Sequence, residues 1–433
     1  MATDFVHLHV HTEFSTLDSM ARIKLLTAKA KEYGMPAVAM TDHGNLFGAV
    51  PFYQAMTGAG IKPIFGCEVY LAPTKLSDKK DFPGRKRSTH LTLLAKDNKG
   101  YDNLTMLVSV GHLDGLYWDE PRIDFDTLRK YSEGIICLSG DGEGPIHEWL
   151  DKSNFDEAEK IACQLLDIYG KEDFYIELQN HHEEVQEFYN EELVKIARKN
   201  DIKLVATNDV HFMGKEDHDA HDVLICIGEK CLKLDDNRKS YPQDVYFKSG
   251  DEMAEAFPEL PEAISNTMEI TEKCNVTMVL DPTSSEKYPQ FDSPDGSPRE
   301  EYFRKVCYDG LAANYGEEEM KRLEGTYDTD RAGVEKILDD RLKYEIDTIN
   351  SLGFASYFLI TTSLTGPVSK ISLWGLVVVQ LQDHWWLTPW VSLTFARCGS
   401  VYFLRDSLIR SVFLRPMWIL TSARLDAPKL SNT

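Results

Sequence analysis

Three histidines, His7, His9 and His11, alternate along residues 5–11 (FVHLHVH). Successive side chains of a β-strand point to opposite faces, so a strand here would carry all three imidazoles on one face. Neutral imidazole is a common ligand of borderline metals, and the run therefore favours a metal site. The alternative is a solvated strand face that happens to carry histidines.

More histidines and carboxylates stand at the ends or starts of predicted strands further along the chain. They are Asp18, Asp42, His43, Glu68, His90, Asp141, Asp209 and His211. A single carboxylate at such a place often caps the next helix, so Asp42 is either a cap or a hydrogen-bond partner of a ligand histidine. The repetition predicts a site for two or three divalent cations.

Clustered divalent cations clamp a phosphate and lower the pKa of a bound water toward neutrality, so that hydroxide can attack phosphorus. Mixed nitrogen and oxygen ligands suit zinc, manganese or iron better than magnesium alone. The residues on their own therefore predict a metal-dependent phosphoesterase.

Strand and helix patterns alternate through the first 230 residues and must position this set. The strand-like stretches are 5–11, 36–41, 62–70, 90–95, 134–139, 173–179 and 203–207. The helix-like stretches are 20–33, 46–58, 98–112, 155–169 and 184–199. Regular alternation predicts an α/β fold with a mostly parallel sheet, and about seven units favour a closed barrel over an open sheet. In such folds the chemistry lies where strands end.

Composition limits the class of protein. The 433 residues carry a formal net charge of -23, which excludes a generally basic nucleic-acid coat but leaves room for a local basic groove. The eight cysteines form no dense framework and no secretory signal precedes the first strand, so we expect reduced thiols in the cytoplasm. No apolar run has the length of a membrane span.

Several strings in order resemble the PHP (polymerase and histidinol phosphatase) domain, in the version found in bacterial replicative DNA polymerase III alpha subunits. They are HVHTEFS, MTDHGNLFGAV, HLTLLAKDNKGYDNL, GIICLSG and VATNDVHF. The resemblance implies a distorted seven-unit (βα) barrel and nine ligands for up to three metals, at His9, His11, Asp18, His43, Glu68, His90, Asp141, Asp209 and His211.

One position departs from the family pattern. Asp141 stands where many metal-competent members carry Cys, and a carboxylate is a harder ligand that changes metal preference. His7 matches no ligand of the family and is interpreted as structural.

The resemblance to these polymerases continues beyond residue 230. It implies a PHP domain over 1–280, and residues 281–300, rich in Pro, Ser and Asp, read as a linker. A helix is expected from Pro261 to about residue 273, and further helices over 299–315 and 331–352. Residues 301–360 resemble a mostly helical start of the polymerase palm.

Composition changes again after about residue 360. Residues 361–433 hold five of the seven tryptophans and no Glu, with a net charge of +4 against -27 for the preceding 360 residues. A shift of reading frame by one base would let residues 374–379 (WGLVVV) encode VGPGRG and residues 416–422 (PMWILTS) encode PDVDIDF, two motifs of the family's palm. We interpret the tail as a frameshifted translation without a native fold, and the chain as lacking the catalytic residues for polymerisation.

Two hypotheses for function follow from the resemblance. In the first, the chain is part of a replicative DNA polymerase whose PHP domain binds zinc or manganese and acts as a 3′–5′ exonuclease on DNA. In the second, the domain is a metal-stabilised scaffold that docks a proofreading subunit. A free-standing phosphatase for small phosphate monoesters is a third reading, disfavoured by the polymerase-like segment. For the full-length protein the resemblance also implies magnesium and a sliding clamp.

Overall fold

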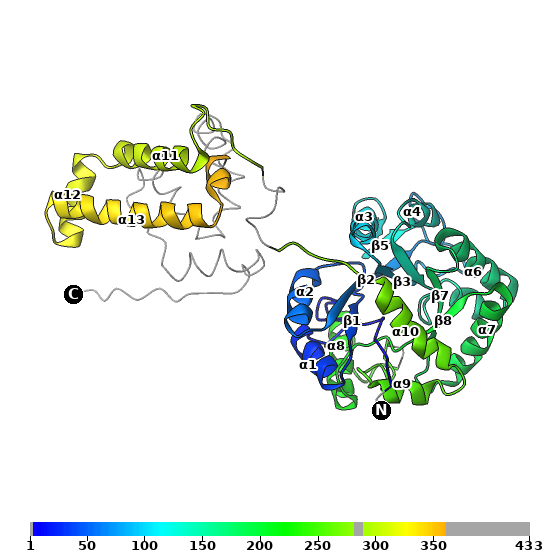
Figure 1. The fold of residues 1–433 in the computed structure, drawn as a ribbon. Coiled ribbons are helices and arrows are strands. Elements are labelled where there is room, and N and C mark those ends of the chain that lie inside the picture. The colour runs from blue at the N-terminus through cyan, green and yellow to red at the C-terminus, as the bar shows by residue number, and fades with distance from the viewer. Residues whose placement is uncertain (1–2, 237, 281–288, 361–433) are drawn as a thin grey trace. The chain divides into compact units, whose positions relative to one another are not determined.

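The computed structural model describes residues 3–236, 238–280 and 289–360. It divides into two compact units, with the boundary between Met278 and Val279 (Figure 1). The tail 361–433, which we interpret as frameshifted, lies outside the described residues, as do residues 281–288 of the predicted linker.

An eight-stranded sheet forms the centre of the first unit. Its strands are β1 (Ala37–Met40), β2 (Lys62–Leu71), β3 (Thr89–Ala95), β4 (Leu116–Tyr117), β5 (Glu120–Ile123), β6 (Ile135–Leu138), β7 (Phe174–Gln179) and β8 (Lys203–Thr207). They are ordered β4-β5-β2-β3-β6-β7-β8, and β1 pairs with β2 in parallel. Six of the seven predicted strands are therefore present as strands.

Residues 7–11 close this sheet into a barrel. The amide of Ala39, in β1, donates a hydrogen bond of 2.9 Å to the carbonyl of His7, and the amide of His11 donates one of 2.9 Å to the carbonyl of Val210, just after β8. The segment thus lies between β1 and the end of β8. The barrel predicted from about seven βα units is confirmed.

The segment that closes the barrel is not a regular strand, which corrects the prediction for residues 5–11. Its ladder is broken because the amide of Val10 donates to the Thr41 hydroxyl at 2.8 Å instead of to a backbone carbonyl. Only the isolated bridge between Val10 and Val210 remains.

The mostly parallel sheet also needs a correction at β3, which is antiparallel to both of its neighbours, β2 and β6. Parallel strands need a crossover connection, usually a helix. The β2–β3 connection, residues 72–88, contains no helix, and the chain returns directly alongside β2.

Helices surround the barrel in Figure 1. In the first unit they are α1 (Ile23–Glu32), α2 (Ala49–Gly58), α3 (Asn98–Leu113), α4 (Phe125–Lys130), α5 (His147–Leu150), α6 (Phe155–Tyr169), α7 (Glu184–Asn200), the 3₁₀ turn η1 (Lys215–Asp217), α8 (His218–Glu229), α9 (Gly250–Ala256) and α10 (Pro261–Lys273). The bounds predicted for α6 and α10 agree with the structure.

Local signals explain where several of these helices begin. The side chain of Asp97 accepts from the amide of Gly100 at the start of α3, and Asn154 accepts from the amide of Glu157 at the start of α6. Such caps satisfy amides that lack a partner in the first turn and contribute about 1 kcal/mol each. α10 begins at Pro261, whose fixed φ suits the first helical position.

The barrel is stabilised by apolar side chains from both strands and helices. Phe52 of α2, Phe65 of β2 and Phe174 of β7 are almost fully buried in one cluster. Burial of one such side chain contributes roughly 1.5–3 kcal/mol. This packing fixes the strand ends that carry the polar residues described below.

The second unit is helical in its described part. It contains α11 (Arg299–Asn314), α12 (Glu317–Tyr327) and α13 (Arg331–Ser351). α13 packs against α11 through a cluster that includes Phe303, Leu342 and Ile346, and against α12 through one that includes Leu323 and Val334. Across the described residues, no helix combines the length and apolar character that a membrane crossing requires.

Candidate metal centre

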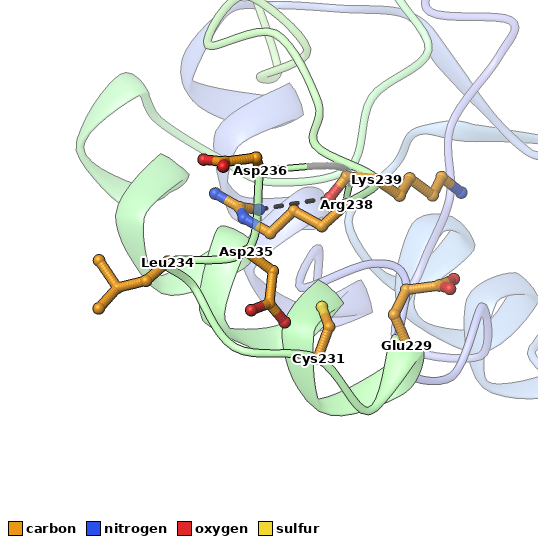
Figure 2. Close-up of a pocket in the computed structure, with 7 residues that line it drawn as sticks. All are labelled: Glu229, Cys231, Leu234, Asp235, Asp236, Arg238 and Lys239. Carbon is orange, nitrogen blue, oxygen red and sulfur yellow. Dashed lines mark hydrogen bonds between the residues drawn. The ribbon is translucent and has the colours of Figure 1, made fainter.

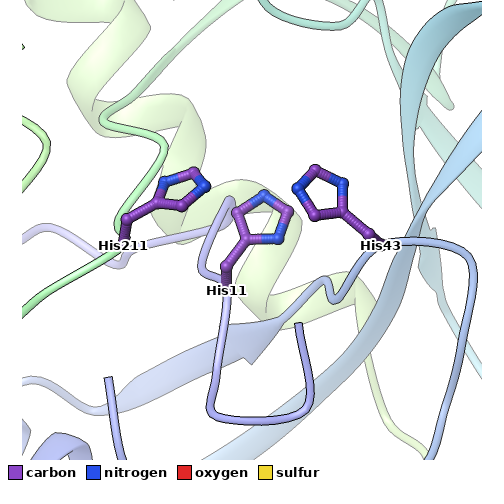
Figure 3. A group of neighbouring side chains, drawn as sticks. All are labelled: His11, His43 and His211. Carbon is purple, nitrogen blue, oxygen red and sulfur yellow. The ribbon is translucent and has the colours of Figure 1, made fainter. Parts of the chain in front are cut away.

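Eight of the nine predicted ligands gather at one end of the barrel. Five side chains lie on or next to four elements: His9 and His11 on the closing segment, His43 after β1, Glu68 on β2 and His90 on β3. Asp209 and His211 follow β8, and Asp18 lies in the loop after the closing segment. Figure 3 shows His11, His43 and His211 with their rings turned toward one another.

Three overlapping groups within this set have ligand atoms close enough to hold a cation. They are His11, His43 and His211; His9, His11 and Asp209; and His43, Glu68 and His90. Because neighbouring groups share His11 or His43, the three positions form one connected centre.

Glu68 lies in the middle of the centre and is almost completely buried. Its Oε2 is 2.9 Å from His43 Nδ1 and 3.1 Å from His11 Nε2, and its Oε1 is 2.8 Å from His90 Nδ1. Burial opposes the charged form, but the positive charges of His90 and His43 outweigh it and hold the pKa of Glu68 well below its usual range.

Asp209 supplies a second central carboxylate from a strained turn. Its Oδ1 lies 3.4 Å from His9 Nε2 and 3.2 Å from His11 Nε2. The backbone of Asp209 has a φ of 45°, in the left-handed region that costs a non-glycine residue energy and that recurs at functional sites. The turn also places the Asp209 carbonyl 2.8 Å from His211 Nδ1, so the His211 Nε2 is directed into the centre.

Asp18 is a third carboxylate of the centre and lies between His43 and His211. Its Oδ2 lies 2.7 Å from His43 Nε2 and 3.1 Å from His211 Nε2. Tyr241 donates its hydroxyl to the same carboxylate at 3.0 Å, and Lys239 Nζ is 3.3 Å from Oδ1. The sequence reasoning did not single out Lys239 or Tyr241, because nothing in the segment after α8 marks it as part of this loop cluster.

Lys239 also borders a cavity of about 530 Å³ beside the centre (Figure 2). The cavity is lined by Glu229, Cys231, Leu234, Asp235, Asp236, Arg238 and Lys239. In Figure 2 the Lys239 side chain extends away from Arg238 and Asp235. Lys239 thus borders both this cavity and, through its contact with Asp18, the metal centre.

Asp141 lies apart from the three groups. Its Oδ1 accepts from the amide of Glu143 at 3.0 Å, within its own loop. Burial and the negative charge of Glu68 raise the pKa of Asp141 to about 7, while the charge of His90 opposes this rise. The carboxyl is thus within electrostatic reach of the centre without contacting another predicted ligand.

His7 does not join its two neighbours. Its Nε2 contacts the carbonyl of Lys248 at 2.8 Å, and its ring packs against Phe247. Burial lowers the pKa of His7 to about 4. The interpretation of His7 as structural agrees with these contacts, whereas the expectation that all three imidazoles share one site does not.

Side chains behind the centre hold the histidines in place. Glu177 of β7 accepts from His9 Nδ1 at 2.7 Å, which directs His9 Nε2 toward the centre. His11 Nδ1 lies 3.0 Å from the hydroxyl of Ser15, which in turn donates to Asp42 at 2.7 Å. Asp42 also accepts from the amide of Thr12 at 2.6 Å, so it supports His11 through Ser15 and through the neighbouring backbone, and it caps no helix. A lone carboxylate in the otherwise apolar strand FYIELQ was the available signal for Glu177.

The buried carboxylates of the centre shift the pKa values of its histidines, as expected for a site that binds cations. Burial of His43 disfavours its charge, but Glu68 and Asp18 outweigh burial and raise its pKa to about 10. The pKa of His11 is lowered by burial and by the charges of His43 and His211. Buried oxygens of Glu68 and Asp209 lie against these imidazole nitrogens. Buried carboxylate oxygens among converging imidazole nitrogens fit divalent metal ions.

Comparison with known proteins agrees with this geometry. Residues 7–181 match the PHP domain family. A DNA polymerase III alpha subunit of Borreliella burgdorferi is 40% identical over 358 residues, which cover 82% of this chain and 30% of that protein. Over 82% of its length, the chain is therefore similar to DNA polymerase III alpha subunits.

Other alpha subunits match to a similar extent. The subunit of Aquifex aeolicus is 38% identical, over 86% of this chain and 32% of its own length. The subunit of Pseudomonas aeruginosa is 39% identical, over 83% of this chain and 29% of its own length. The chain therefore spans about 30% of the length of these alpha subunits.

A solved structure of a two-domain protein from Bacteroides vulgatus, described as containing a predicted PHP-like metal-dependent phosphoesterase, is also similar. It covers 49% of this chain and 55% of its own, with 15% identity and a TM-score of 0.29.

Proposed function

We propose that the PHP domain of this chain is a metal-dependent phosphodiesterase that removes nucleotides from 3′ ends of DNA, and that it serves a replicative polymerase. The observation that carries the proposal is the connected set of three ligand groups, in which the buried carboxylates of Glu68 and Asp209 converge with imidazole nitrogens. The proposed ligands are His9, His11, Asp18, His43, Glu68, His90, Asp141, Asp209 and His211, with zinc or manganese as the metals.

Divalent ions held there would neutralise phosphate charge and make a water nucleophilic at neutral pH. The residues of the chain have their own tasks. Glu177 and Ser15 orient His9 and His11 through their Nδ1 atoms, which keeps the Nε2 atoms free to ligate. Lys239 and Tyr241 contact the Asp18 carboxylate through a positive charge and a hydroxyl donor, and so hold this proposed ligand in place.

The polymerase assignment extends beyond the chain itself. DNA-directed DNA synthesis with magnesium is proposed for the full-length protein, together with a proofreading subunit and a sliding clamp as partners. No residue of this chain is assigned to polymerisation. A cytoplasmic location also remains a prediction.

A scaffold role is the second candidate, and one observation favours it. Asp141 accepts a hydrogen bond from its own loop and contacts none of the other proposed ligands, which would leave the set incomplete for catalysis. In that case the metals would stabilise a surface for a proofreading subunit.

A comparison of substrates separates the candidates. The full-length chain, supplied with zinc or manganese, is incubated with a 5′-labelled DNA strand and, separately, with small phosphate monoesters. Stepwise shortening of the strand from its 3′ end supports the exonuclease. Turnover of monoesters alone indicates a small-molecule phosphatase, and no turnover with metal bound leaves the scaffold. Glu187→Gln, at an exposed position of α7, is a control that should behave as the parent chain.

A further inference from the structure

A basic loop leads directly into the metal centre. The β2–β3 connection holds six basic and two acidic residues between positions 72 and 89, in a chain whose net charge is -23. It ends next to His90, a proposed ligand at the start of β3. Such a local reversal of charge beside a phosphate-handling site suggests binding of a polyanion.

The loop is fixed to the barrel by buried side chains. Glu148 of α5, which is 2% exposed, accepts from the amide of Lys86 at 3.0 Å and from Arg85 Nε at 2.8 Å. Arg122 of β5 is fully buried and donates through Nη1 to the carbonyl of Arg87 at 3.1 Å. The backbone that carries Lys86 and Arg87 is therefore held in a defined place, which lowers the entropic cost of binding a ligand.

Two of these cations remain available to a ligand. Lys86 Nζ reaches the rim of the centre, 3.5 Å from the carbonyl of Gly142. Arg87 has only long ion-pair contacts, 3.5 Å to Asp81 and 3.7 Å to Glu120. Contacts of this length at an exposed site contribute little and are easily exchanged for a phosphate.

An aromatic ring stands beside Arg87. Trp118, in the turn between β4 and β5, is 71% exposed, and the Arg87 guanidinium lies 5.1 Å from its ring centre. Its φ of 58° is in the left-handed region, so this ring is presented from a strained turn. Exposed aromatic rings next to cations are typical platforms for unpaired bases.

The strand register places Arg87 and Trp118 near the metal centre. Tyr70 of β2 pairs with His90 on one side and with Arg122 on the other. The centre of the Tyr70 ring lies 5.1 Å from the centre of the His90 ring and 6.1 Å from that of the His43 ring. Adjacent strands are about 4.8 Å apart, so Arg122 is only about 10 Å from His90 across the sheet.

We propose that Lys86, Arg87 and Trp118 form a binding track for single-stranded nucleic acid, along which the strand enters the metal centre past Tyr70. The assignment rests on the proposed function and adds the residues that bind the strand outside the metal centre. Lys86 and Arg87 bind the phosphodiester backbone, and the indole of Trp118 stacks on an unpaired base.

The test measures binding and chemistry separately on the full-length chain. Binding of a fluorescent oligothymidylate of roughly 12 nucleotides is followed by anisotropy over a range of salt concentrations, in EDTA to prevent cleavage. Hydrolysis of bis(p-nitrophenyl) phosphate is followed with metal present. The variants are Trp118→Ala, Trp118→Tyr and Arg87→Gln. Matched controls are Phe188→Ala and Arg129→Gln, both at exposed positions on other helices.

Trp118→Ala is expected to weaken binding about tenfold, and Trp118→Tyr to restore most of it, because stacking needs only an aromatic face. Arg87→Gln is expected to lower the slope of log Kd against log salt concentration by about one, which is the change for the loss of one phosphate contact. Hydrolysis of the small diester should not change in any of these variants, and the controls should bind as the parent chain.

Equal binding by the parent chain, Trp118→Ala and Arg87→Gln, with diester hydrolysis intact, would overturn the track and leave the proposed function standing. Binding that depends on Trp118 and Arg87 in a chain that hydrolyses no diester would support the track and count against the phosphodiesterase. Preference for a duplex of the same sequence, or no binding of nucleic acid at all, would overturn the assignment and point to a protein partner at Trp118.

Discussion

Glu177 Oε1 lies 2.7 Å from Nδ1 of His9, and both side chains are buried inside the barrel. The same oxygen accepts from the Thr207 hydroxyl at 2.6 Å. A carboxylate behind a histidine fixes its tautomer and its ring orientation and raises its basicity as a ligand. Glu177 is therefore a positioning residue for the metal centre, although it is not itself a proposed ligand.

Removal of this carboxylate should weaken metal binding. We expect Glu177→Ala to lower the affinity of the chain for zinc by about 10- to 100-fold. Glu177→Gln keeps an acceptor for His9 and should have a smaller effect. Affinity can be measured by competition with a chelating dye, with Glu172→Gln, at an exposed position before β7, as control. Unchanged affinity in Glu177→Ala would contradict the positioning role.

Replacement of Glu68 should lower both the stability of the metal-free chain and the number of metal ions that the chain binds. Without metal, Glu68→Gln leaves the imidazolium of His90 without its central counter-charge and that of His43 with Asp18 alone, which should lower the free energy of unfolding by roughly 3 kcal/mol. With metal, the variant should bind fewer ions per chain. Urea unfolding with and without EDTA measures the first effect, and elemental analysis the second. A variant as stable and as metal-loaded as the parent would argue against a central role of Glu68.

Metal binding should release protons, and its affinity should rise with pH. The pKa of His43 is about 10 in the metal-free chain, against an ordinary value of 6.5, so at pH 7 this ring carries a proton that a metal must displace. Calorimetry in two buffers with different ionisation enthalpies reports the number of protons released. Affinity that is independent of pH between 6 and 9 would contradict this prediction.

The stability of the metal-free chain should depend on pH in the opposite direction. A folded pKa of about 10 for His43 means that its stabilisation is complete below pH 6.5 and is lost as pH rises toward 10. The lowered pKa of Glu68 acts oppositely, because its contribution is lost only on acidification. Thermal unfolding in EDTA should therefore show a lower Tm at pH 9 than at pH 6, whereas the stabilisation gained from added metal should be larger at pH 9.

The metal preference should respond to Asp141. Asp141→Cys introduces a softer ligand, and we expect the ratio of bound zinc to bound manganese to increase when both are offered together. The ratio can be measured by elemental analysis after dialysis. An unchanged ratio would indicate that residue 141 does not ligate.

Much of the barrel follows from periodicity in the sequence. Strands buried on both faces, such as KLVAT, appear as short apolar runs, and α3, α4 and α6 begin after a capping Asp or Asn. The direction of β3 does not follow from periodicity, because an apolar run looks the same in either direction. Residues 5–11 failed as a strand because one side-chain hydroxyl, that of Thr41, replaces a backbone acceptor.

The centre was predictable to the extent that ligand types recur at strand ends. His9, His43, Glu68 and His90 could be placed in one site because the ends of barrel strands converge. The partners behind them could not be found in this way, since Ser15 and Lys239 have ordinary surroundings in the sequence. The Lys86–Arg87–Trp118 track likewise depends on a hairpin, β4–β5, that is too short to give a periodic signal.

The most direct test of the account combines metal content and nuclease activity on one preparation of the full-length chain. It is compared with an Asp209→Asn and His211→Ala double variant, where Asn tolerates the left-handed backbone at position 209. We predict bound zinc or manganese and 3′–5′ shortening of a DNA strand in the parent chain, and loss of both in the variant. Bound metal with no shortening in the parent chain would contradict the exonuclease and leave a structural metal site.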